Sequence, residues 1–259
     1  MMLEAVVIVL REVLEAALLV SLLLLMCRQR GIHTTWLIPA TITGLGGAMI
    51  YASQLAWVSE RWDYSGQEIV NATMQLLIFL SVCCLFLLVN RPKNSHHGKI
   101  AFSMALVVAL ALVREVSEIF LYLQAFWGTE KNPLPVLMGA AVGAMTGVST
   151  GVLIYYLVAW MDIRRSAFLV AGLLAVTVAG IATQAVSLLE QVDRIPYSPP
   201  IWDTSHWVAE DTLLGQLLYA LLGYEATPTV WHVSTYALVL LTLALAYASP
   251  KLSGALSGD

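Results

Sequence analysis

Residues 11–15 read Arg-Glu-Val-Leu-Glu, and residues 114–118 read Arg-Glu-Val-Ser-Glu. Each pentapeptide lies inside a long apolar stretch, residues 3–26 for the first and residues 100–127 for the second. Ionisable side chains in the hydrocarbon core of a bilayer are costly, so they are rare there and usually face a pathway or a buried partner. Their repetition at matched places therefore indicates a function inside a membrane.

The composition is that of an integral membrane protein. The chain has 259 residues, of which 59% are hydrophobic and only 12% are charged, whereas soluble domains are typically about 25% charged. The mild net charge of −4 gives no indication of nucleic-acid binding, and we expect no nucleic-acid partner. We expect a multi-pass protein of the plasma membrane (the inner membrane in bacteria), surrounded by the lipid bilayer. Nothing resembles a nucleotide-binding motif, and we expect no cofactor.

Seven apolar stretches have a length near the roughly 20 residues that an α-helix needs to span a bilayer. They fall at residues 3–26, 36–57, 67–89, 100–127, 135–160, 167–189 and 231–248. The predicted fold class is therefore an all-α polytopic membrane protein with seven transmembrane helices, forming a single membrane domain over residues 1–259.

Basic residues predict the orientation of these helices, because cytoplasmic loops carry an excess of lysine and arginine. Outside the two pentapeptides, eight basic residues fall on one side of the membrane and three on the other. They are Arg28, Arg30, Arg91, Lys93, Lys99, Arg164, Arg165 and Lys251, against Arg61, Lys131 and Arg194. This bias places the N-terminus outside, the C-terminus in the cytoplasm, and the long connection at residues 190–230 outside.

The two pentapeptides are 103 residues apart, and the same offset matches Gly44 with Gly147. We interpret residues 1–89 and 100–189 as two repeats of three helices, with residues 231–248 as an added seventh helix. Because three is an odd number, the second repeat runs inverted, an arrangement of transporters that bind their substrate near the midplane. The few matches outside the pentapeptides can also arise by chance.

Glycines recur every fourth residue in the fifth apolar stretch, at Gly139, Gly143, Gly147 and Gly151. Such a stripe allows a neighbouring helix to approach closely. Close packing is the favoured interpretation, and a pathway lined by backbone is the alternative.

The external connection contains a short helical pattern. Leucines repeat with a period near four between Leu213 and Leu222, Asp211 or Thr212 can cap the start, and Gly223 can end the helix. We expect a short amphipathic helix that lies at the outer membrane interface.

The two glutamates of each pentapeptide are three residues apart and share one helix face. At 1.5 Å per residue, Glu12 lies about 14 Å from the outer start of the first helix, and Glu115 lies about 18 Å from the outer end of the fourth. Both are near the midplane at similar depth. Paired across the repeat interface, the motifs bring together a defined set of charges: Glu12, Glu15, Glu115 and Glu118, with Arg11 and Arg114.

Four carboxylates and two guanidiniums leave a charge of −2 when all are ionised, so the buried cluster takes up protons or binds a cation. Carboxylate oxygens suit hard cations. We therefore expect the four glutamates to be metal ligands and the two arginines to hold them by bidentate hydrogen bonds. The alternative is a purely structural ion-pair network between the first and fourth helices.

Two further groups of side chains are candidates for an outer access step. They are Glu68, Asn71 and Gln75 near the outer end of the third helix, and Asp203, His206 and Glu210 in the external connection. The acidic connection can attract cations or a metal-carrying partner. A solvated helix start and a solvated loop are the alternatives.

At these motifs the chain resembles the iron permease family, the oxidase-dependent iron transporters, and most closely its bacterial EfeU-like members. Residues 11–20 are similar to the signature of the family's first helix. His96-His97-Gly98, followed by residues 114–118, is similar to its fourth-helix signature, and residues 213–224 resemble the region before its seventh helix.

The chain also departs from the family pattern, as a divergent member does. Val13 and Val116 stand where the family usually has glycine, and Asn71-Ala72 stands where a carboxylate followed by glycine is frequent.

The resemblance implies a seven-helix permease, not an enzyme, that imports iron with the motif glutamates as ligands. It implies that iron is the transported substrate and arrives as ferric ion from an external ferroxidase or iron-binding protein. Two alternatives remain open: a permease for another cation such as manganese or lead, and a membrane enzyme that uses the buried carboxylates as acid and base.

Overall fold

The fold is all-helical across the residues that the structure describes. This computed structural model describes residues 2–89, 97–127 and 133–256. Its helical elements, in chain order, are α1 (Met2–Arg30), the 3₁₀ turn η1 (Thr34–Trp36), α2 (Leu37–Ser53), α3 (Leu55–Ser59), α4 (Gly66–Val89), α5 (His97–Trp127), α6 (Leu134–Ala159), α7 (Ile163–Gln191), α8 (Leu213–Leu222) and α9 (Val230–Leu256). Extended backbone pairs within these ranges at an isolated bridge between Pro200 and Thr229. The all-α prediction is confirmed.

Over the described ranges, five helices are long and apolar enough to cross a bilayer: α4, α5, α6, α7 and α9. α1 is 29 residues long, but charged residues interrupt it. α2 has 17 residues and is followed, after Gln54, by α3. The seven spans and the orientation therefore stay predictions. Arg91, Lys93 and Lys131, which contributed to the predicted orientation, lie outside the described residues.

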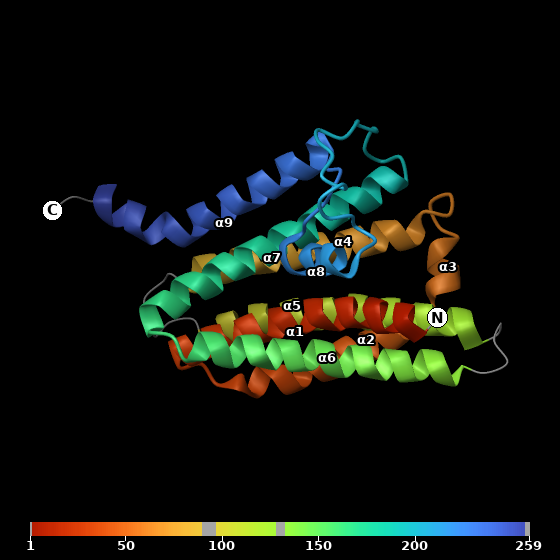
Figure 1. The fold of residues 1–259 in the computed structure, drawn as a ribbon. Helices are drawn as coiled ribbons and strands as arrows, with labels where there is room; N and C mark the ends of the chain where they lie inside the picture. Colours follow the sequence, from red (N-terminus) through yellow and green to blue (C-terminus); the bar gives the residue numbers. More distant parts are fainter. Residues whose placement is uncertain (1, 90–96, 128–132, 257–259) are drawn as a thin grey trace.

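The helices form a bundle in which most elements run along one common direction (Figure 1). α1 packs against α5 and α6, and α2 packs against the other side of α5. α4 and α7 lie against this group and against each other, and α9 packs on α7 and α4. The apolar core joins the C-terminal half of α1 to α4, α5 and α7, with Leu22, Val82, Met104 and Leu174 fully buried. Both pentapeptides lie beyond one edge of this core.

The glycine stripe of α6 faces α1. A Cβ atom added to Gly143 would lie 2.5 Å from the carbonyl oxygen of Val6, and one added to Gly151 would lie 2.7 Å from the Cβ atom of Ala17. The two backbones are therefore too close for larger residues, as in other membrane helix pairs with small interfacial residues. This confirms the packing interpretation of the stripe.

α2 approaches α5 in the same way. A Cβ atom added to Gly44 would lie 2.8 Å from the Cβ atom of Leu112, and one added to Gly47 would lie 2.7 Å from Cγ2 of Val113. Glycine contacts therefore hold α2 against the helix that carries the second pentapeptide, as they hold α6 against the helix that carries the first.

The helix predicted in the external connection is present as α8, but its position differs from the prediction. Thr212 caps it by accepting a hydrogen bond from the Gly215 amide at 3.1 Å, and Gly223 ends it in the left-handed region at φ 67°. However, α8 packs against α1 and α7, and Gly223 touches Gly180 in the interior of α7.

Gly180 lies eleven residues, or about 16 Å, from the Gln191 end of α7. Thus α8 enters the bundle instead of lying along its end, as Figure 1 shows. Apart from Gln216 and Tyr219, α8 carries only apolar residues and glycine. Its buried residues are Gly215 and Ala220, while Leu213, Leu214 and Leu222 remain exposed.

Candidate functional site: a buried glutamate cluster

The two pentapeptides meet where α1 and α5 contact each other. Glu12 and Glu15 are each 1% exposed, Glu115 is 2% exposed and Arg114 is 5% exposed. The side chain of Glu118 keeps 24% of its surface exposed. The two motifs face each other across the contact between α1 and α5, so residues about 100 positions apart in sequence form a single polar cluster in an apolar bundle.

Arg114 joins the two motifs. Its Nη1 donates to Glu15 Oε2 on α1 at 3.2 Å and to Glu115 Oε1 at 2.8 Å, and its Nε donates to Glu118 Oε1 at 3.2 Å. One guanidinium therefore holds three of the four motif glutamates in place. This is the geometry that the predicted supporting role requires.

Arg11 occupies the same motif position but has different partners. Its Nε donates to Glu12 Oε1 at 2.9 Å, and Nη2 pairs with the same oxygen. The guanidinium also lies over the ring of Tyr219 on α8, with Cζ 5.9 Å from the ring centroid. Glu15 is four residues from Arg11, yet the structure shows no hydrogen bond between these two described side chains. The two motif copies are therefore arranged asymmetrically.

Three of the predicted metal ligands converge. Glu12, Glu115 and Glu118 each offer a carboxylate oxygen, and these oxygens lie within 4.8 Å of one another. Over the described part of the chain, Glu12 Oε2, Glu15 Oε1 and Glu115 Oε2 are buried without a hydrogen-bond partner. Burying an unpaired carboxylate oxygen is costly, and a bound cation relieves that cost. The residues fit a hard cation held by two helices, with Glu15 beside it on Arg114.

Among the residues predicted for the outer access step, Asn71 contacts the cluster. Its Nδ2 lies 3.5 Å from Glu118 Oε1, and its Oδ1 accepts a hydrogen bond from Tyr51 of α2 at 3.0 Å. Gln75 instead donates to Gln184 of α7 at 3.1 Å, which ties α4 to α7. Glu68 and Gln75 each keep a buried oxygen that has no partner among the described residues.

The residues predicted in the external connection are exposed and serve the loop itself. Asp203 accepts hydrogen bonds from the hydroxyl and the amide of Ser205, which lower the pKa of its carboxyl group. Glu210 accepts from the Ala226 amide at 2.6 Å, and His206 lies against Trp207. The structure shows no hydrogen bond or ion pair between these described residues and the glutamate cluster. His96 lies outside the described residues.

A second polar cluster was not predicted. His232 of α9 lies between two carboxylates, with Nε2 3.0 Å from Glu190 Oε2 and Nδ1 2.6 Å from Glu225 Oε2. Ser187 of α7 lies 3.0 Å from the same Nε2 atom. This cluster ties the segment after α8 to α7 and α9. The signal that identifies His232 in the sequence is an ionisable residue inside the predicted seventh helix. Tyr219 carries no comparable signal.

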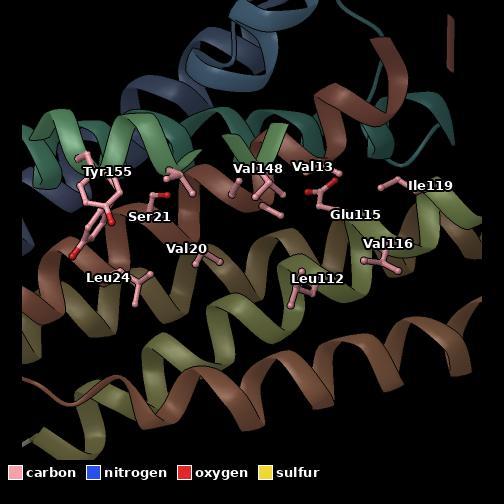
Figure 2. Close-up of a pocket in the computed structure, with 14 residues that line it drawn as sticks. Val13, Val20, Ser21, Leu24, Leu112, Glu115, Val116, Ile119, Val148 and Tyr155 are labelled. Carbon is pink, nitrogen blue, oxygen red and sulfur yellow. The ribbon is translucent and has the colours of Figure 1, made fainter. Parts of the chain in front are cut away.

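A cavity of about 430 Å³ lies beside Glu115, between α1, α5 and α6 (Figure 2). Figure 2 shows Glu115 next to Val13 and Val148, while Leu24 and Tyr155 lie toward the far end. Glu115 is the one charged residue among those that line the cavity. Ser21, Tyr155 and Tyr156 bring hydroxyl groups to a lining that is otherwise apolar, and the other three motif glutamates do not line this cavity.

Val13 and Val116, where the resemblance led us to expect glycine, both line this cavity. Val13 packs against Gly147 of α6, where an added Cβ atom would lie 2.9 Å from Val13 Cγ1. Neither valine brings a ligand atom to the cluster. These departures therefore change the apolar wall next to the site and leave its set of carboxylates intact.

Comparison with known proteins identifies the family of the chain. The model of the iron permease FTR1 family matches residues 2–250. The ferrous iron permease EfeU of Shigella sonnei (strain Ss046) and that of Escherichia coli O157:H7 are each 27% identical to the chain over 275 aligned positions. Both alignments cover 96% of this chain and 96% of the relative. No solved structure is significantly similar.

A family match over nearly the whole sequence has direct consequences. The predicted resemblance is confirmed, and so is the prediction of a transporter in place of an enzyme. The predicted location, a multi-pass protein of the plasma membrane, agrees with the family and with the helices that can span a bilayer. The buried glutamates, the apolar helices and the extent of the match together lead to one assignment: this chain belongs to the iron permease FTR1 family.

Proposed function

We propose that this chain imports iron and that Glu12, Glu115 and Glu118 bind the ion directly, with Glu15 positioned by Arg114. The observation that carries the proposal is the convergence of three carboxylates within 4.8 Å. The unpaired buried oxygens of the same cluster support it. A structural ion-pair network would leave fewer such oxygens unpaired, because each costs stability and offers nothing in return.

The proposal also concerns the oxidation state of the transported iron and the protein that delivers it. The resemblance implies ferric ion from an external ferroxidase or iron-binding protein. The relatives are named ferrous iron permeases, and a divalent ion brings the −2 cluster to zero whereas a trivalent ion leaves +1. Uptake of radioactive iron into proteoliposomes separates the two forms. Uptake only with a reductant present identifies ferrous ion as the substrate, and uptake from ferric citrate without reductant identifies ferric ion.

We also propose that the two halves form an inverted repeat in which α1, α2 and α4 correspond to α5, α6 and α7. The helix contacts support this correspondence. Exchanging the halves turns the α1–α6 contact into the α5–α2 contact and the α4–α5 contact into the α7–α1 contact. The contacts α1–α5 and α4–α7 map onto themselves, and all of these pairs are in contact.

The experiment that tests the function is iron uptake by the purified full chain in liposomes. Glu12→Gln and Glu115→Gln keep side-chain size but remove one ligand charge each. We expect each to abolish uptake or reduce it severely while the protein still inserts. Glu60→Gln, at an exposed glutamate after α3, is the matched control and should transport normally. Normal uptake by both motif variants would show that the buried charges are structural.

A further inference from the structure

The position of α8 follows from its sequence and from one close backbone contact. The buried residues of α8 are Gly215 and Ala220, and Gly223 at its end meets Gly180 of α7. A Cβ atom added to Gly180 would lie 2.8 Å from the Gly223 Cα atom. Only glycine on both helices allows α8 to reach this depth, and at this depth its one aromatic side chain, Tyr219, reaches Arg11.

Several contacts hold the end of α8 where it is. The hydroxyl of Tyr236 on α9 donates to the Leu222 carbonyl at 2.9 Å. The next residues are held by the Tyr224 hydroxyl, which donates to the Val208 carbonyl at 3.0 Å, and by the contact of Glu225 with His232. The segment is anchored on α7, on α9 and on its own loop. The ring of Tyr219 is therefore presented to α1 by a fixed element.

The contrast between the motif copies shows what this ring does. Arg114 bonds to Glu118, four residues further along its own helix, at 3.2 Å. Such a pair is favourable on any helix, so Arg11 has the same opportunity with Glu15. Arg11 instead pairs with Glu12 Oε1 alone and lies over the ring of Tyr219, and Glu15 Oε1 is buried without a hydrogen-bond partner among the described residues. The clear difference in surroundings is that α8 packs on α1.

We propose that Tyr219 is a positioning residue of the iron site, which holds the Arg11 guanidinium away from Glu15 so that the free carboxylate oxygens stay available to the ion. This inference rests on the proposed function of the glutamates. Without the ring, Arg11 turns to Glu15 Oε1 and forms the pair that Arg114 forms with Glu118. A guanidinium at that place repels an incoming cation and occupies an oxygen next to its ligands.

The test uses equilibrium binding of ferrous iron, kept reduced, to the purified full chain. Tyr219→Leu removes the ring and keeps an apolar side chain that the neighbouring leucines show to be compatible with α8. We expect its Kd for iron to rise about fivefold, the strength of a partly desolvated cation–π contact. Tyr219→Phe keeps the ring and should bind iron as the unchanged protein does. Tyr156→Leu, at an exposed position of α6, is the control for the substitution itself.

A double variant separates positioning from general damage to α8. In an Arg11→Gln background there is no guanidinium to reposition, so adding Tyr219→Leu should leave the Kd unchanged. An equal rise in Kd in both backgrounds would overturn the proposal, as would an unchanged Kd in Tyr219→Leu alone or a loss of binding in Tyr219→Phe. Tyr219→Met is the second ring-free variant if Tyr219→Leu does not fold.

The same assay distinguishes this inference from the proposed function. Iron binding that survives Glu115→Gln unchanged contradicts the glutamate site itself. Binding that depends on Glu115 but ignores Tyr219 contradicts the positioning role alone.

Discussion

Arg114 Nη1 lies 3.2 Å from Glu15 Oε2, and this hydrogen bond joins the charged motif of α5 to that of α1 across 99 positions of sequence. Both side chains are almost fully buried. Because Glu15 is buried away from water, its charge depends on Arg114, which also serves Glu115 and Glu118. This hydrogen bond therefore couples the position of the second motif to that of the first.

Shortening the ligands should impair transport even though the charge is retained. Glu12→Asp and Glu115→Asp each withdraw a carboxylate by one methylene from a cluster whose oxygens lie within 4.8 Å of one another. α1 and α5 cannot move closer together to compensate for the shorter side chains, because glycine contacts fix α1 against α6 and α5 against α2. We expect iron uptake in proteoliposomes to fall on the order of tenfold or more, as when metal sites lose supporting geometry. Unchanged initial rates in both variants would show that the ion is not held in a fixed cage.

Replacing either motif arginine by lysine should reduce uptake, and the change at Arg114 should have the larger effect. Lysine keeps the charge but lacks the fork that serves Glu15, Glu115 and Glu118 together. Arg114→Lys should also lower the free energy of unfolding by about 1–3 kcal/mol, because buried acceptors lose their donor.

Arg11→Lys is the internal comparison, since Arg11 is more exposed and pairs with Glu12. Uptake and thermal unfolding in detergent measure both effects. Wild-type rates in both Arg→Lys variants would remove the supporting role of the arginines.

Replacing glycine by alanine should lower the stability only where the glycine is in close contact with a neighbouring helix. Gly143→Ala places a Cβ atom 2.5 Å from the Val6 carbonyl oxygen, whereas Gly46→Ala meets nothing within 4 Å. We expect Gly143→Ala to destabilise the protein by about 1–3 kcal/mol, the usual effect of overpacking. Gly46→Ala should change stability by about 0.5 kcal/mol or less. Equal melting temperatures for the two variants would contradict the close contact of α1 and α6.

The orientation predicted from basic residues can be tested with a reporter fused after Asp259. Eight basic residues on one side against three on the other place that end in the cytoplasm. A reporter that is active only in the cytoplasm should therefore be active, and one that is active only outside should be silent. The reverse result would invert the membrane topology and with it the side from which α8 enters the bundle.

The amino-acid sequence alone was sufficient to predict the helices and the cluster of charges. Long apolar stretches must be helical in a bilayer, because every backbone polar group has to be satisfied within its own segment. Six of the seven predicted stretches each correspond to one helix of the structure, whereas residues 36–57 are divided between α2 and α3. The leucine pattern with its caps correctly predicted that α8 is helical, but not its position. The similar depth of Glu12 and Glu115 in two apolar helices was likewise enough to predict that the two side chains lie close together, as they do in the structure.

Only the tertiary structure decided how the two motif copies differ. Their sequences are almost identical, so nothing in residues 11–15 or 114–118 distinguishes the partners of Arg11 from those of Arg114. The difference comes from α8, which reaches Arg11 because the glycines at 180 and 223 let two backbones touch. The two glycines lie in segments that share no sequence motif. A local sequence pattern predicts that a segment is helical and which of its faces is apolar, but it does not predict which distant helix packs beside it.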